Sequence, residues 1–321
     1  MIFSGCVSRS PQDRHDGGRV RVLVTGALGF IGTALLPALE AAGYGVRGLG
    51  RAAGPLADWR SADLTSPASL AGVCADCDAV IHLAGVAHTR ASGADHRAVT
   101  VEGTRALLAE ARAAGVAQFL FVSSIKAECA RDEYADSRRA AEELMRKAGL
   151  PSCMIVRPAL VYGPGVRGNL KRLLQLADHP WPLPIPRGLA RRSLVHRDDL
   201  VRVLVALLSG HAHTATYTVT DGMPYTMREI YDVMRVGCGR RVGRYALPAG
   251  ALTALARFGD GVTHWTRRPC PWDTSALAPL LEACVSTDDG VWGAIGLTPR
   301  YSLAQSVAGM VEALRVGGGA R

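Results

Sequence analysis

Short apolar runs alternate with amphipathic stretches along the first two thirds of the chain. The apolar runs predict buried strands, and apolar residues at helical spacing between them predict helices. Expected strands cover residues 20–25, 45–50, 78–85, 118–124, 153–158 and 215–220. One expected helix runs through Leu35 and Leu39, others cover residues 100–114 and 134–148, and residues 193–208 indicate a strand leading into a helix. This alternation predicts an α/β fold, a doubly wound parallel sheet with helices on both faces.

Three glycines lie where the first strand gives way to the first helix. Gly26, Gly29 and Gly32 are spaced G-x-x-G-x-x-G. Gly26 permits a tight turn, Gly29 lets a pyrophosphate approach the backbone, and Gly32 lets the helix pack closely on the strand. Glycine spacing alone is also compatible with a turn that binds no ligand. Its place between a strand and a helix favours a Rossmann-type domain that binds a dinucleotide.

The second expected strand ends at Arg51. In a doubly wound sheet this end faces the adenosine ribose, where an acidic residue binds the hydroxyls and an arginine suits a 2′-phosphate. Arg51 is therefore predicted to contact the cofactor, and it favours NADP slightly over NAD.

The character of the chain changes after Tyr162, where Gly163-Pro-Gly165 is followed by the proline-rich residues 180–186. We expect a disordered extension over residues 1–18, a dinucleotide-binding domain over 19–165 and a smaller substrate-binding lobe over 166–321. Because a strand and a helix are expected within residues 193–220, the lobe is predicted to be partly interleaved with the first domain.

The net charge of +9 comes mostly from arginines spread along the chain. This distribution favours anionic small ligands, and neither a nucleic-acid motif nor an apolar run of membrane-spanning length is present. Residues 1–18 lack the apolar centre of a signal peptide, and eight scattered cysteines in a chain of this length suggest reduced thiols, so a cytoplasmic protein is expected. Cys74 and Cys77 have no second pair at metal-ligand spacing, and no metal is expected.

Several longer motifs follow the glycine loop. They are VTGALGFIG (24–32), Asp63-Leu64, HLAG (82–85), VEGT (101–104), FVSSIK (121–126), RPALVYGPG (157–165), RRSLVHRDDL (191–200) and PRYSL (299–303). Together they resemble the extended short-chain dehydrogenase/reductase family, in its NAD-dependent epimerase/dehydratase group, which works on nucleotide sugars. FVSSIK is most similar to bacterial nucleotide-sugar 4-epimerases and 4-ketoreductases of surface-polysaccharide biosynthesis. The resemblance extends from Val20 to about Leu314.

The resemblance implies a role for many residues of the first domain. Gly26, Gly29, Phe30 and Ile31 would line the pyrophosphate, Asp63 and Leu64 would flank the adenine, and Leu83, Ala84 and Gly85 would lie along the inner ribose. Ser124 matches the catalytic Ser/Thr, and Tyr134 matches the tyrosine of the Y-x-x-x-K motif. Asn169 and Arg192 match positions that bind the diphosphate of a nucleotide sugar.

Each of these residues also has a plainer interpretation. Ser124 could cap the turn after its strand, Tyr134 could be a buried residue at a helix start, and Arg192 could belong to a solvated basic face. His82 and His196 are expected to be packed strand residues.

The motif departs from the family at Arg138, which stands where the lysine of Y-x-x-x-K belongs. A cation beside the tyrosine lowers its pKa, so that it takes a hydroxyl proton as hydride leaves, and donates the proton in reduction. Arginine retains the charge, but its planar fork donates differently from an ammonium. Ile125 and Lys126 replace the acidic pair that follows the catalytic Ser/Thr in the family's dehydratases, which argues against dehydration.

The sequence therefore predicts an NAD(P)-dependent oxidoreductase or epimerase acting at C4 of a UDP-linked sugar, with Tyr134 as acid/base, Ser124 orienting the oxygen and Arg138 replacing the lysine. One alternative is a binding protein of the same fold, for a dinucleotide or a sugar nucleotide, that has lost turnover. Another is a reductase of a non-sugar ketone or alcohol. The resemblance also implies a homodimer through helices at about 103–114 and 134–148.

Overall fold

The computed structural model describes residues 19–85, 92–186, 191–210, 214–244, 248–266, 283–286 and 290–318. The extension predicted over residues 1–18 lies outside this part of the chain. The chain forms two compact units: unit 1 comprises Met1–Ala159, Arg197–Val219 and Thr287–Arg300, and unit 2 comprises Leu160–His196, Thr220–Ser286 and Tyr301–Arg321. The chain therefore passes between the units several times.

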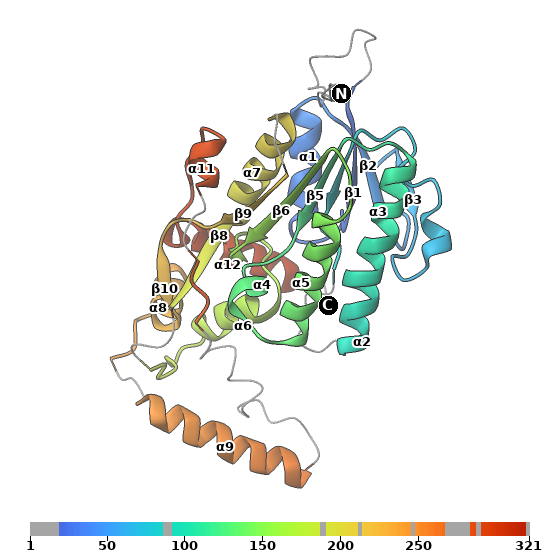
Figure 1. The fold of residues 1–321 in the computed structure, drawn as a ribbon. Helices are drawn as coiled ribbons and strands as arrows, with labels where there is room; N and C mark the ends of the chain where they lie inside the picture. The colour runs from blue at the N-terminus through green and yellow to red at the C-terminus, as the bar shows by residue number, and fades with distance from the viewer. Residues whose placement is uncertain are drawn as a thin grey trace. The chain divides into compact units, whose positions relative to one another are not determined.

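Unit 1 contains a seven-stranded sheet in the order β3-β2-β1-β4-β5-β6-β9 (Figure 1). Every neighbouring pair of these strands is parallel. The strands are β1 (Arg21–Thr25), β2 (Gly45–Gly50), β3 (Trp59–Ser61), β4 (Ala79–His82), β5 (Gln118–Val122), β6 (Ser152–Pro158) and β9 (Ala215–Val219). The predicted doubly wound α/β fold is confirmed.

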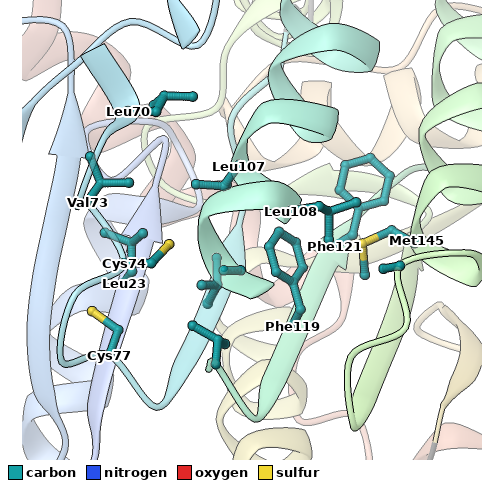
Figure 2. Close-up of a cluster of buried hydrophobic side chains, with 14 of the residues drawn as sticks. Leu23, Leu70, Val73, Cys74, Cys77, Leu107, Leu108, Phe119, Phe121 and Met145 are labelled. Atoms are coloured by element: carbon teal, nitrogen blue, oxygen red, sulfur yellow. The ribbon is translucent and has the colours of Figure 1, made fainter. Parts of the chain in front are cut away.

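Helices cover both faces of this sheet. Helices α1 (Gly32–Ala41) and α7 (Arg197–Ser209) pack together on one face, and α3 (Gly103–Ala113) and α5 (Glu133–Arg146) pack together on the other. Figure 2 shows the core beneath α3, where Leu107 and Leu108 lie over Phe119 and Phe121 of β5. These side chains are buried, and removing such apolar surface from water is the main term that stabilises the layered fold.

The helix expected from Thr100 begins earlier than predicted. Helix α2 (Gly93–His96) leads into a π-helical turn, η2 (Arg97–Glu102), which continues into α3. Ser92 and Asp95 form a reciprocal capping box that starts α2. A π-helical turn widens the backbone spiral and is frequent at functional sites.

Short elements complete unit 1. They are the 3₁₀ turn η1 (Pro67–Leu70) and the short helices α4 (Lys126–Cys129) and α11 (Val291–Ala294). Buried Asp199 of α7 explains part of the RRSLVHRDDL motif, because it accepts hydrogen bonds from Arg202 Nη1 (2.7 Å) and from the backbone N–H of Arg300 (2.9 Å). The carboxylate thus holds the start of PRYSL, at Arg300, against α7.

Unit 2 contains a three-stranded sheet, β10-β8-β7, made of β7 (Leu160–Tyr162), β8 (Arg191–His196) and β10 (Pro224–Thr226). Helix α8 (Met227–Gly237) begins with a capping box between Thr226 and Glu229, and it packs against α6 (Gly168–Ala177) and α12 (Leu303–Gly318). Helix α9 spans Ala249–Thr266.

The thiols of Cys74, Cys77, Cys153 and Cys238 are free, and burial raises the pKa of the Cys74 thiol to about 12. Cys129 and Cys284 are disulfide-bonded, so the expectation of reduced thiols is wrong at these two positions.

Within the described residues, the helices all fall short of the length and apolarity needed to cross a membrane.

A buried ionic network fixes α5 to the sheet. Glu142 accepts hydrogen bonds from Ser123 Oγ (2.7 Å), from Arg157 Nη2 (2.6 Å) and from Arg146 Nη2 (3.1 Å). Burial alone would raise the pKa of Glu142, but the hydrogen bonds from Arg157 and Ser123 and the two positive charges hold it below its ordinary value. This network positions the helix that carries Tyr134 and Arg138 relative to the strand end that carries Ser124.

We expect Glu142→Gln to lower the free energy of unfolding by about 3 kcal/mol, because it removes the charge of a buried carboxylate that accepts from partly buried Arg157 and from the Ser123 hydroxyl. A depressed pKa in the folded state means that the carboxylate stabilises the fold above its unfolded pKa and loses this effect as pH falls through the folded value. Urea unfolding at pH 7 and pH 3 checks both points, and the gap between wild type and Glu142→Gln should narrow at pH 3. The exposed neighbour variant Glu143→Gln is the control and should unfold nearly as the wild type does. An equal effect of the two variants would contradict the role given to Glu142.

Candidate active site

The glycine loop joins β1 to α1 and fits closely against the end of β4. Gly26 has a φ of +65°, and a Cβ there would lie 2.8 Å from the backbone nitrogen of Ala84. A Cβ on Gly29 would lie 2.9 Å from the oxygen of Gly26, to which the Gly29 N–H donates. Glycine is therefore required at both positions by the packing of the loop itself, and Gly26 forms the tight turn that the sequence predicts. The approach of a pyrophosphate at Gly29 stays a prediction.

The other two residues expected at the pyrophosphate, Phe30 and Ile31, are partly exposed beside the start of α1. Ile31 precedes the first helical residue, and its side chain caps no backbone group. The guanidinium of Arg197 lies 5.4 Å from the centroid of the Phe30 ring. The motif analysis did not single out Arg197, which brings a positive charge beside the loop expected to bind phosphates.

The residues expected at the adenine and its ribose follow β2 and β3. Asp63 accepts hydrogen bonds from the backbone and hydroxyl of Thr65, and these bonds, together with the charge of Arg51, lower the pKa of Asp63. Arg51 itself is exposed directly after β2. Leu64 is buried, and a Cβ on Gly103 would lie 2.8 Å from its Cβ, so Gly103 lets α3 approach this segment. Arg51 and Asp63 are thus brought close enough to interact electrostatically.

Leu83, Ala84 and Gly85 continue from β4 toward Arg138. Ala84 lies against Gly26, and a Cβ on Gly85 would lie 3.0 Å from Arg138 Cζ and closer still to Nη2. Glycine at position 85 therefore leaves the space that the guanidinium occupies. The structure brings the glycine loop, residues 83–85 and Arg138 together in unit 1.

Ser124 and Tyr134 come from two neighbouring elements. Ser124 is half-buried just beyond β5, and its Oγ accepts a hydrogen bond from the backbone N–H of Lys126 (3.2 Å), so it does cap the following turn. Tyr134 lies in the first turn of α5, whose N-cap is Asp132. Within the described part of the chain, the Tyr134 hydroxyl makes no hydrogen bond to protein. It is therefore available to a ligand.

Arg138 is a buried cation one helical turn after Tyr134. It is 4% exposed, its Nη1 donates to the carbonyl of Val122 (3.0 Å), and its Cζ lies 5.1 Å from the centroid of the Tyr134 ring. Its Nε is buried without a partner, and no carboxylate among the described residues forms an ion pair with it. A buried charge left without a counter-charge is costly, which marks this position as a candidate for function.

Sequence reasoning did not identify His96, which packs against the Tyr134 ring. Its ring meets the Tyr134 ring edge to face, with centroids 5.7 Å apart, and His96 is buried with no hydrogen-bond partner for its Nδ1 in the described part of the chain. The nearby sequence signal is the capping box of Ser92 and Asp95, which indicates that a helix starts just before His96. His96 fixes the orientation of the Tyr134 ring by contact.

The two residues expected to bind a diphosphate belong to unit 2. Asn169 is exposed in the first turn of α6, and Arg192 is half-buried on β8, opposite Tyr225 of β10. Each is held on a regular element of that unit.

Residues of unit 1 fit a nicotinamide dinucleotide. The glycine loop lies against the end of β4 at a position where a Cβ would clash, and Arg138 presents a buried Nε that has no hydrogen-bond acceptor among the described residues. These features lie along the carboxyl ends of β1, β4 and β5, where doubly wound sheets bind their ligands.

Comparison with known proteins supports this assignment. A ceramide reductase of Caulobacter vibrioides is 38% identical over 193 residues, which cover 58% of this chain and 60% of that protein. A UDP-glucose 4-epimerase of Vibrio cholerae is 27% identical over 257 residues, covering 71% of this chain and 78% of that protein. The solved structure of MoeE5 in complex with UDP-glucuronic acid and NAD superposes with a TM-score of 0.71 at 23% identity, covering 94% of this chain and 100% of the other, and shows the shared fold.

The model of the NAD dependent epimerase/dehydratase family matches residues 22–219, well over half of the chain. The resemblance inferred from the motifs is confirmed, and so is the expectation of a nicotinamide cofactor at the level of the family. This chain belongs to the NAD-dependent epimerase/dehydratase family.

Proposed function

We propose that the chain is an NAD(P)-dependent oxidoreductase that transfers a hydride between the nicotinamide and a secondary alcohol or the corresponding ketone. The observation that carries this proposal is the Tyr134 phenol, which makes no hydrogen bond within the described part of the chain and lies beside the buried guanidinium of Arg138, which has no carboxylate partner there. A phenol placed beside a cation is suited to exchange a proton with an alcohol oxygen.

The bound dinucleotide supplies the hydride acceptor or donor. Tyr134 takes the hydroxyl proton in oxidation and returns it in reduction. Ser124 donates its hydroxyl hydrogen to the substrate oxygen and so orients the reacting carbon. Arg138 stabilises the negative charge that develops on the phenol oxygen, and its Nη1 contact with Val122 keeps the guanidinium in place.

For the substrate, we propose C4 of a UDP-linked sugar. Arg192 supports this choice, because an arginine held on a strand can form a bidentate contact with a diphosphate, and Asn169 adds an amide donor. The similarity to the Vibrio cholerae epimerase supports it as well. Reaction at C4 would be epimerisation if the ketone is reduced again on the enzyme, and ketone reduction if the cofactor exchanges.

A second candidate is the reduction of a lipid-like ketone. One observation favours it: the identity with the Caulobacter ceramide reductase, 38%, exceeds the 27% shared with the epimerase. The same residues of unit 1 would perform this reaction, since the reacting group is again a secondary carbinol.

The two substrate classes differ in whether Arg192 matters. For a nucleotide sugar, UDP should bind in calorimetry, and Arg192→Ala should weaken binding by about a hundredfold, since a charge-assisted bidentate contact is lost. The neighbouring exposed variant Arg191→Ala is the control and should bind UDP as the wild type does. Failure of the wild type to bind UDP, together with turnover of a long-chain lipid ketone that Arg192→Ala leaves intact, would replace the first candidate with the second.

We also propose that the protein is a homodimer through α3 and α5. Multi-angle light scattering on the purified protein should give twice the mass of the chain, 33.9 kDa. A monomeric mass would remove this proposal without affecting the chemistry.

A further inference from the structure

A chain of hydrogen bonds crosses the interior of unit 1, from the backbone N–H of Ala84 to the carbonyl of Thr100. The backbone N–H of Ala84 donates to Thr25 Oγ1 (3.2 Å), and Thr25 Oγ1 lies 2.6 Å from His82 Nδ1. On the other side of the ring, His82 Nε2 lies 3.0 Å from Thr104 Oγ1, which donates to the carbonyl of Thr100 (2.5 Å). All four side chains, those of Thr25, His82, Thr100 and Thr104, are fully buried.

The Thr100 carbonyl, which only accepts, and a neutral His82 ring together fix the direction of each hydrogen bond in this network. The Thr100 carbonyl can only accept, so the Thr104 hydroxyl hydrogen points to it, and Thr104 Oγ1 must accept from His82 Nε2. A neutral ring with its proton on Nε2 has no proton on Nδ1, so Thr25 Oγ1, which accepts from the Ala84 N–H, points its own hydrogen to His82 Nδ1. His82 therefore carries its single proton on Nε2.

A second proton on His82 would break this pattern. Nδ1–H and the Ala84 N–H would both donate to Thr25 Oγ1, and the Thr25 hydrogen would lose its acceptor. Burial, and secondarily the charge of Arg138, lower the pKa of His82 to about 3, in agreement with a neutral ring. The ring is further held by Phe119 and Phe121, whose centroids lie 6.1 Å and 5.5 Å from its own.

We infer that His82 is a positioning residue for the dinucleotide loop: a neutral imidazole, protonated on Nε2, that ties the backbone of Ala84 to the π-helical turn at Thr100. The backbone of Ala84 lies against Gly26, so a shift at Ala84 reaches the phosphate loop directly. This role in dinucleotide binding rests on the proposed function, which assigns a dinucleotide to the loop.

Nitrogen-15 NMR of histidine-labelled protein tests the protonation directly, with His82→Gln to assign the signal. The Nε2-protonated neutral pattern should appear and stay constant from pH 5.5 to pH 8. A ring protonated on Nδ1, or one that titrates in this range, would overturn the inference whether or not a dinucleotide binds.

Two substitutions of His82 distinguish its hydrogen bond to Thr25 from its hydrogen bond to Thr104. His82→Asn places an amide oxygen near the Nδ1 position and keeps an acceptor for Thr25, whereas His82→Gln reaches the Nε2 position and keeps a donor for Thr104. In fluorescence titrations with NADH and NADPH, we expect His82→Gln to bind about tenfold more weakly than the wild type and His82→Asn to bind within about twofold. Thr25→Val should weaken dinucleotide binding about as much as His82→Gln does. Thr25→Ser keeps the hydroxyl and should bind as the wild type does.

Equal weakening in His82→Asn and His82→Gln would mean that His82 only fills space, and the inference would fail. A wild type that binds neither NADH nor NADPH would refute the proposed function, while the NMR result would still decide the protonation of His82.

Discussion

Tyr134→Phe is expected to lower kcat by two to four orders of magnitude while leaving the affinity for NADH or NADPH and the melting temperature almost unchanged. A positioned general acid or base contributes about 10²–10⁴-fold to a rate. The hydroxyl is the only group removed, and it makes no hydrogen bond to described protein residues, so the fold loses no contact. The ring, packed between His96 and Arg138, remains.

Steady-state kinetics with fluorescence titration of the dinucleotide separate these effects. Tyr162→Phe is not a suitable control, because its hydroxyl donates to the carbonyl of Tyr301 (3.0 Å) within unit 2. Tyr44→Phe is suitable, since the Tyr44 hydroxyl is buried and has no hydrogen-bond partner among the described residues. Unchanged turnover in Tyr134→Phe would show that Tyr134 is only a packed residue at a helix start.

Arg138→Met is expected to lower kcat by about a hundredfold and to keep or raise the stability of the protein. The lost rate follows from losing a fixed cation beside the developing charge of the phenol. The stability follows because the guanidinium is buried and, among the described residues, has no carboxylate partner and no acceptor for its Nε. Replacing such a charge with an apolar side chain is often neutral or stabilising. Opposite changes in turnover and melting temperature would identify a residue kept for function.

Arg138→Lys is the matched variant, since it retains the charge and changes only the donor geometry. We expect its turnover to stay within about tenfold of the wild type. A wild type without measurable turnover, together with a large rise in Arg138→Lys, would support a binding protein that has lost catalysis. A fall in melting temperature for Arg138→Met without a loss of turnover would show that the arginine serves the fold alone.

The parts of unit 1 that the sequence predicts are those set by local patterns. Apolar runs such as 118–124 give strands, because a strand buried on both faces needs a continuous apolar run. The glycine loop is predictable, because the close approach to Ala84 and the positive φ of Gly26 exclude other residues. The predicted packing of His82 in its strand is confirmed by its complete burial.

The features that were not predicted depend on contacts distant in sequence. Thr25, His82 and Thr104 form one hydrogen-bonded chain, yet nothing local to any of them indicates a partner tens of residues away. The π-helical turn at Arg97–Glu102 lies within a continuous helical stretch, and the sequence there shows no pattern that distinguishes it from an α-helix. The missing counter-charge of Arg138 appears only when the surroundings of its side chain are known.

Mass spectrometry of the purified protein, denatured before and after incubation with NADH and NADPH, tests the central claim most directly. The account predicts a nicotinamide dinucleotide released from the protein in a ratio of about one per chain, either retained through purification or taken up on incubation. Retained NAD⁺ would favour epimerisation with the cofactor recycled in each turnover, and uptake of NADPH by an empty protein would favour a reductase. A protein that neither retains nor takes up either dinucleotide would contradict the account.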